Sequence, residues 1–97
     1  MTKVGGVTGM RSVMALAELF GVQVVPHSAY FGPGLLASVH CIAAMARESL
    51  VERFYCDFAD NPLGDAIHPR DGRLAIPQGP GLGVDPDPRL VEKLRTS

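Results

Sequence analysis

The sequence lacks the features that mark several common classes of protein. No apolar run approaches the roughly 20 residues needed to cross a bilayer, so we expect no membrane-spanning segment. Lys and Arg total 9 against 10 Asp and Glu, and the resulting net charge of −1 argues against nucleic-acid binding. The same balance argues against a polybasic segment that would attach the chain to a membrane surface.

Cysteine is scarce as well. Only Cys41 and Cys56 are present, and neither stands in a CxxC pair or at zinc-finger spacing from a histidine. The first residues, MTKVGGVTG, lack the apolar stretch of a signal peptide, so the expected compartment is the reducing cytoplasm. Disulfides are rare there, and we predict two free thiols.

What the sequence does contain is typical of one small globular domain. Apolar residues make up 46% of its 97 positions and charged residues 20%, which separates it from disordered chains. It has 11 glycines and 8 prolines, so turns are expected to be frequent.

Two segments show the spacing of apolar residues that is typical of helices. The first runs over residues 9–20, with Thr8 as a good N-cap and Gly21 where a C-terminal cap belongs. The second runs over residues 33–47 and has a proline in its first turn.

Three short apolar segments, residues 1–5, 22–26 and 50–54, alternate with these helices. Strands that alternate with helices predict an α/β fold with a parallel sheet and right-handed crossovers. We therefore expect residues 1–56 to form three parallel strands and two helices. Residues 57–97 are expected to form a polar loop, a hairpin and a short helix.

Such a unit is incomplete by itself. Two helices cannot cover both faces of three buried parallel strands, and the outer strands would have open edges. We expect the chain to pack against further segments of a larger α/β fold, against a partner chain, or against a second copy of itself.

Two polar residues stand at the ends of predicted strands, where parallel α/β folds gather their functional groups. His27 follows the segment 22–26, and Glu52 lies in the segment 50–54. A histidine exchanges protons near neutral pH, and a protonated carboxyl group donates a hydrogen bond to a developing oxyanion. The alternatives are a turn-capping role for His27 and an exposed position for Glu52, which the neighbouring Arg53 would suit.

Motifs in four places, taken together, carry a family resemblance. They are Lys3–Met10 (KVGGVTGM), Gly21–Ser28 (GVQVVPHS), Glu52, and Ile76–Gly83 (IPQGPGLG). In this order and at these distances they resemble the C-terminal part of the enolase superfamily. The most similar branch is the mandelate racemase-like one of the mandelate racemase/muconate lactonizing enzyme family.

The resemblance implies a fold and a cofactor. It implies that residues 1–5, 22–26 and 50–54 are the sixth, seventh and eighth strands of a modified (β/α) barrel, a TIM-like fold. The tail 57–97 would pack towards an N-terminal capping domain. It implies a Mg²⁺ ion held by three acidic residues on the third to fifth strands, which would lie upstream of this chain, so no metal ligand is expected here.

The resemblance also implies roles for individual residues. His27 matches the general acid/base histidine, and Glu52 matches the glutamate that hydrogen-bonds the substrate carboxylate or enediolate. Ser28, Tyr30 and Phe31 fall in the loop that shapes access for the substrate. The aspartate that pairs with the histidine in this branch would fall immediately before Met1.

Two hypotheses follow for the function. In the first, the chain is the C-terminal portion of a Mg²⁺-dependent enzyme that removes the α-proton of a small carboxylate such as an acid sugar. Dehydratase and racemase/epimerase both fit; dehydration is favoured because it is widespread in this branch. Many relatives are oligomers. In the second, the chain is a non-catalytic fragment that associates with a partner chain or with itself.

Overall fold

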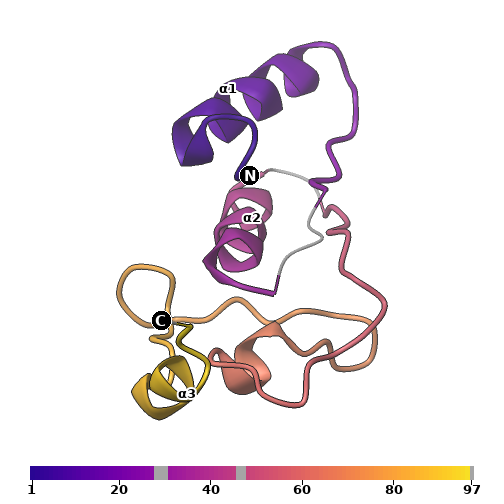
Figure 1. Cartoon of the computed structure of the whole chain (residues 1–97). Helices are drawn as coiled ribbons and strands as arrows, with labels where there is room; N and C mark the ends of the chain where they lie inside the picture. Colours follow the sequence, from indigo (N-terminus) through magenta and orange to yellow (C-terminus); the bar gives the residue numbers. More distant parts are fainter. Residues whose placement is uncertain (28–30, 46–47, 97) are drawn as a thin grey trace.

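The computed structural model describes residues 1–27, 31–45 and 48–96. Its elements are α1 (Gly6–Leu19), α2 (Pro33–Ala43), the 3₁₀ helix η1 (Gly64–Ile67) and α3 (Pro88–Lys93). In Figure 1 α1 lies above α2, and the tail with η1 and α3 lies below α2. None of the helices in the described ranges is long and apolar enough to cross a membrane.

Helix α1 begins three residues earlier than the sequence predicts. Its N-cap is Gly5, whose φ of 93° places it in the left-handed region, and Thr8 lies inside the helix. Glycine adopts that conformation at little cost, so the helix begins directly at Gly6. The predicted C-terminal cap is confirmed: Gly21 has a φ of 64°, and Val22 N–H donates to the Ala17 carbonyl at 2.8 Å. This is the six-to-one hydrogen bond of a Schellman motif.

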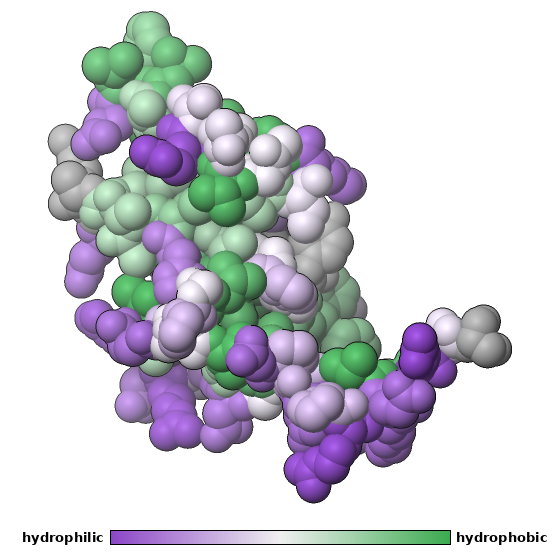
Figure 2. Space-filling view, turned by 90° about the vertical axis from the view of Figure 1, so that its left-hand side faces the viewer, coloured by the Kyte–Doolittle hydropathy of each residue, from purple (hydrophilic) through white to green (hydrophobic). Residues whose placement is uncertain are grey.

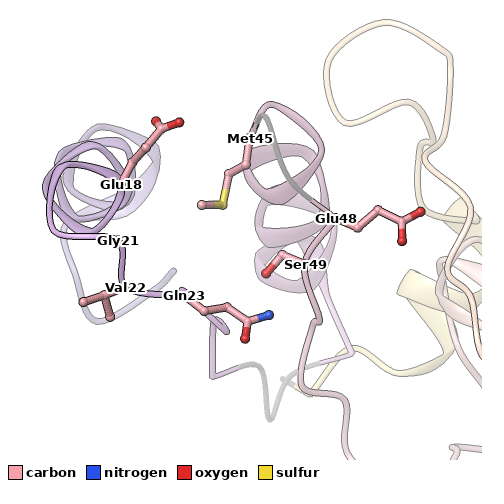
Figure 3. A pocket seen from close by; sticks show the side chains of 7 residues that line it. All are labelled: Glu18, Gly21, Val22, Gln23, Met45, Glu48 and Ser49. Carbon is pink, nitrogen blue, oxygen red and sulfur yellow. The ribbon is translucent and has the colours of Figure 1, made fainter.

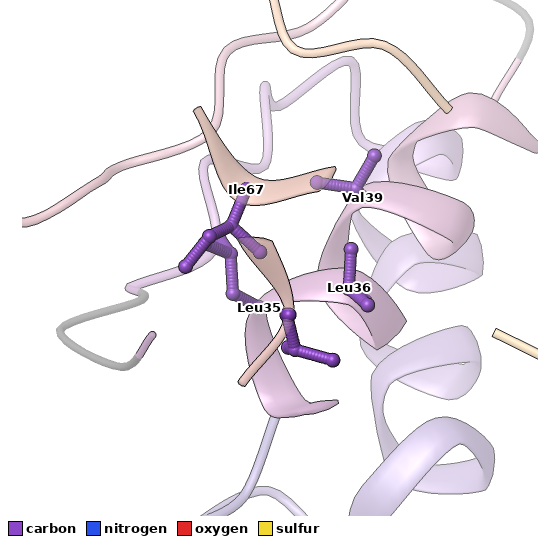
Figure 4. Close-up of a cluster of buried hydrophobic side chains, with 5 residues drawn as sticks. Leu35, Leu36, Val39 and Ile67 are labelled. Atoms are coloured by element: carbon purple, nitrogen blue, oxygen red, sulfur yellow. The ribbon is translucent and has the colours of Figure 1, made fainter. Parts of the chain in front are cut away.

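Helix α2 begins with Pro33 at its first position, as predicted, and ends at Ala43 instead of residue 47. It carries most of the buried side chains. Leu35, Leu36 and Val39 pack against Leu63 and Ile67 from the tail, and Leu35 has no exposed surface. Figure 4 shows Ile67 facing the three α2 side chains across this cluster.

The three predicted strands are not formed in the residues that the structure describes. Residues 2–5 form a turn in which Val4 N–H donates to the Met1 carbonyl at 3.3 Å. Residues 22–27 and 48–54 are irregular, and no backbone ladder joins them. Buried parallel strands are stabilised by cover on both faces, whereas Val22 and Val25 are 59% and 45% exposed here. Without that cover the backbone stays irregular.

The predicted hairpin is reduced to its turn. Arg70 and Arg73 form an isolated antiparallel bridge with two backbone hydrogen bonds of 2.9 Å. Asp71 and Gly72 both have positive φ, as a two-residue hairpin loop of type I′ requires. Ile67, three residues before this bridge, belongs to η1 and is buried in the α2 cluster.

The tail ends in α3, where the sequence predicts a short helix. Asp87 is its N-cap, and the Asp87 side chain accepts a hydrogen bond from Arg89 N–H at 2.8 Å. Figure 2 shows hydrophilic side chains gathered at the bottom of the molecule and hydrophobic surface at its top. Among the exposed large apolar side chains, Leu19 and Phe20 at the end of α1 are 83% and 76% exposed.

Candidate functional site

Two irregular segments position the candidate site. Residues 22–27 follow α1, and residues 48–54 follow α2. Ser49 Oγ donates a hydrogen bond of 2.8 Å to the Val24 carbonyl. Three residues further along both segments, His27 Nδ1 is hydrogen-bonded to Glu52 Oε2. Both contacts join residues 25 apart in sequence, so the two segments run side by side in the same direction.

The structure thus brings together the two residues selected from the sequence. Their side chains remain accessible, with 69% of His27 and 51% of Glu52 exposed. A carboxylate that is hydrogen-bonded to Nδ1 favours the imidazole tautomer with its proton on Nδ1. Nε2 is then the nitrogen that can accept a proton from a substrate or return one. The sequence placed these residues at neighbouring strand ends, but it did not predict their direct pairing.

Arg53 is a residue whose importance the sequence reasoning missed. Its side chain is only 14% exposed, whereas the sequence offered Arg53 only as a neighbour that would suit an exposed Glu52. Nε donates to the Ile67 carbonyl at 3.0 Å, Nη1 donates to the Phe54 carbonyl at 3.3 Å, and Nη2 donates to Asp57. The carboxylate four residues after the arginine was the signal in the sequence that could have indicated this pairing.

Phe31 belongs to an aromatic cluster with Phe54 and Phe58. Its ring centroid lies 5.9 Å from that of Phe54 and 4.6 Å from that of Phe58, both edge to face. The guanidinium carbon of Arg53 lies 5.7 Å from the Phe31 centroid, within the range of a cation–π contact. Ser28 and Tyr30, the other two predicted substrate-binding residues, lie outside the described residues.

Asp57 provides a test of the Arg53 contacts by pH. The hydrogen bond from Arg53 is the main cause that holds the pKa of Asp57 below its ordinary value of 3.8, and the charges of Arg53 and His68 add to it. A lowered pKa means that ionised Asp57 stabilises the fold above pH 3.8, and that this stabilisation is lost as the pH falls through the lowered pKa.

We expect a carbon-detected NMR titration of Asp57 to give a midpoint below 3.8 in the wild-type chain. In Arg53→Gln the midpoint should rise towards the ordinary value of 3.8, because the main cause of the lowered pKa is removed. Arg70→Gln is the control, because Arg70 is exposed and pairs with Asp65 instead. A midpoint that stays unchanged in Arg53→Gln would contradict the arrangement.

A cavity of 220 Å³ lies near the starts of the same two segments, away from His27 and Glu52. Figure 3 shows the seven residues that line it: Glu18, Gly21, Val22, Gln23, Met45, Glu48 and Ser49. In parallel α/β folds the functional groups gather at the carboxyl ends of strands. The ends of the segments, where His27 and Glu52 meet, are therefore the better candidate site.

Across residues 1–27, 31–45 and 48–96, no three His, Cys, Asp or Glu side chains are grouped so that they could hold a metal ion. The described residues therefore do not fit a Mg²⁺ ion by themselves. Cys41 is buried, Cys56 is half-buried, and both are free thiols, as predicted.

Comparison with known proteins settles the family. The family model for enolase C-terminal domain-like proteins matches residues 1–90. The chain belongs to the enolase C-terminal domain-like family. This membership confirms the resemblance drawn from the sequence motifs, and it implies the C-terminal part of a TIM-like barrel. No solved structure matches the chain.

Curated relatives of this enolase-family chain are dehydratases and cycloisomerases. D-gluconate dehydratase from Thermoproteus tenax is 35% identical over 95 residues, which cover 95% of the chain and 19% of the relative. Muconate cycloisomerase 1 from Rhodococcus opacus is 32% identical over 87 residues, covering 87% and 23%. D-galactarolactone cycloisomerase from Agrobacterium fabrum is 29% identical over 91 residues, covering 84% and 24%. The chain thus spans about a fifth to a quarter of the relatives' length.

Proposed function

We propose that this chain is the C-terminal portion of a cytoplasmic enolase-superfamily enzyme that moves the α-proton of a small carboxylate substrate. The observation that supports the proposal is the contact between His27 and Glu52 where two parallel segments end. In this proposal residues 1–5, 22–26 and 50–54 become the sixth to eighth barrel strands once further barrel segments cover them. Activity is tested with this segment joined to the rest of such a barrel, called the intact enzyme below.

The proposed chemistry assigns a proton to each partner. His27 uses Nε2 as general acid/base, accepting the α-proton or returning one to the substrate. Glu52 accepts a hydrogen bond from His27 Nδ1 at Oε2. When protonated at Oε1, the same carboxyl group donates a hydrogen bond to the substrate carboxylate as negative charge develops there.

Dehydration of an acid sugar is the favoured reaction. The support comes from relatives with such names, which include D-gluconate dehydratase and arabinonate dehydratase. In such a reaction the α-proton and the neighbouring hydroxyl group leave together as water, and His27 can protonate the departing hydroxyl. Racemisation or epimerisation by the same pair is the alternative. Ser28, Tyr30 and Phe31 are proposed to belong to the loop that contacts the substrate.

The proposal places the remaining parts of the site outside the described residues. The family resemblance implies a Mg²⁺ ion on acidic residues of other barrel strands and an aspartate that also pairs with the histidine. We assign no metal-dependent step to the chain itself. Exposed apolar side chains such as Leu19, Phe20 and Leu50 support packing against those further segments or against a second copy. A purely monomeric chain in sedimentation equilibrium would rule out self-association.

Replacement of Glu52 tests the role given to its carboxyl group. An amide both accepts and donates a hydrogen bond, so Glu52→Gln in the intact enzyme should lower kcat by about tenfold. Glu52→Leu has a similar size but can do neither, and its loss should reach at least about 100-fold. Steady-state turnover of D-gluconate would measure both. Equal losses of kcat in Glu52→Gln and Glu52→Leu would contradict the hydrogen-bonding role, because the amide keeps the hydrogen bonds and the leucine does not. Equally large losses would mean that the carboxyl group transfers a proton.

A further inference from the structure

We propose that Arg53 is a positioning residue that holds Glu52 against His27. This inference rests on the proposed function of the pair and adds a residue to it. Arg53 directly follows Glu52 in sequence, and its own side chain is 14% exposed, against 51% for that of Glu52.

The hydrogen bonds of Arg53 fix the chain that follows Glu52. Nε donates to the carbonyl of Ile67, and Ile67 is itself 1% exposed in the cluster that packs on α2. Nη1 and Nη2 donate to the Phe54 carbonyl and the Asp57 carboxylate, which follow Glu52 along the chain. The guanidinium is therefore anchored to the core and bonded to the segment that carries Glu52.

Arg53 also reaches the segment that follows His27. Its guanidinium carbon lies 5.7 Å from the ring centroid of Phe31, which lies four residues after His27 and packs on the same core cluster. One planar cation thus contacts the Glu52 segment, the tail and Phe31, which lies two residues before α2 begins. Guanidinium suits this role because its donors form a rigid fork, whereas a lysine presents a point charge.

The His27–Glu52 pair is exposed and has no comparable cover. The side chains of His27 and Glu52 are 69% and 51% exposed, so burial does little to hold them in place. Their relative position therefore depends on the backbone beneath them, which Arg53 fixes. Catalytic groups displaced by about 1 Å can lose a factor of about 100 in rate, so small movements at Arg53 should affect the chemistry.

A double-mutant cycle in the intact enzyme tests this coupling. We expect Arg53→Gln to lower kcat by about 10- to 100-fold with Glu52 present. If Arg53 acts through Glu52, the same substitution should have less than a threefold effect in a Glu52→Leu background. Full additivity of the two losses would show that Arg53 acts independently of Glu52 and would overturn the proposal. Arg70→Gln, an exposed arginine on the tail, is the matched control.

A second readout does not depend on activity. In the 97-residue chain, the ¹⁵N shifts of the His27 ring report whether Glu52 is hydrogen-bonded to Nδ1. We expect Arg53→Gln to move them towards the values of Glu52→Leu, which cannot accept a hydrogen bond from Nδ1, and Arg70→Gln to leave them at the wild-type values. If Arg53→Gln loses its helical circular dichroism, Arg53→Lys is measured instead, and the same displacement is expected. Wild-type shifts in a folded Arg53 variant would overturn the proposal, whether or not His27 proves catalytic.

Discussion

Replacing His27 by Asn in the intact enzyme should lower kcat by about 10²- to 10⁴-fold, the range that general acid/base groups contribute. Asparagine fits the space and can hydrogen-bond to Glu52, but its amide neither accepts nor returns a proton at neutral pH. The substrate would still bind, because the carboxyl group of Glu52 remains, so KM should change much less than kcat. Steady-state kinetics with an acid-sugar substrate would measure the two parameters separately.

A second histidine provides the control for this substitution. His68 lies on the tail, 3.5 Å from Asp57 and away from the candidate pair. His68→Asn should change kcat by less than about twofold, because His68 takes no part in the contact between His27 and Glu52. If His27→Asn retained wild-type turnover, His27 would have no part in the reaction.

Leu35→Ala is expected to cost about 2–5 kcal/mol in free energy of unfolding, because it opens a cavity in the main core. Leu35 has no exposed surface and packs among Leu36, Leu63 and Ile67, where α2 meets the tail. Mean stabilities of small domains are only about 5–15 kcal/mol, so the variant should lose a large share of its stability. Urea unfolding followed by circular dichroism would give the difference.

The matched control is Leu19→Ala, the same change at the last residue of α1. Leu19 is 83% exposed, so its removal should change the free energy of unfolding by less than about 0.5 kcal/mol. Similar losses at the two positions would mean that the tail does not pack on α2 in solution.

The helices were the part of the fold that local sequence predicted well. Glycine is favoured where a helix ends in a left-handed residue, and proline suits a first helical turn. The end of α1 could therefore be predicted from Gly21 and the start of α2 from Pro33. The start of α1 did not follow, because Gly5 caps it through its backbone conformation alone, with no side-chain hydrogen bond. A serine or threonine N-cap is easier to recognise in a sequence. Because Thr8 fits that role, the sequence predicts a helix that begins too late.

The strand predictions were wrong because a strand forms only when other segments pair with it. Residues 22–26 are short and β-branched, as a buried strand would be, yet a ladder forms only with partners that cover and bond it. The contacts of Ser49 with Val24 and of His27 with Glu52 preserve the parallel course of the two segments without that ladder.

Only part of the candidate site was predicted, because part of it also depends on contacts between residues distant in sequence. His27 and Glu52 could be selected because each follows or ends an apolar segment. For Arg53 the Asp57 carboxylate four residues further on was a local signal, but its contact with the Ile67 carbonyl joins residues 14 apart and could not be selected in the same way. The role of each residue in catalysis stays a proposal that rests on the pairing and on the family.

Exchange of the substrate α-proton in D₂O tests the central claim most directly, since it follows the proposed proton transfer itself. The intact enzyme would be incubated with an acid-sugar substrate, and deuterium at the carbon next to the carboxylate followed by ¹H NMR in the remaining substrate and in any epimer formed. Dehydration turns this carbon into a ketone that carries no hydrogen, so the dehydrated product is not used for the readout. The account predicts that deuterium enters with the wild-type enzyme and that His27→Asn slows its entry by at least about 100-fold. Deuterium entry at the wild-type rate in a folded His27→Asn enzyme would contradict the account.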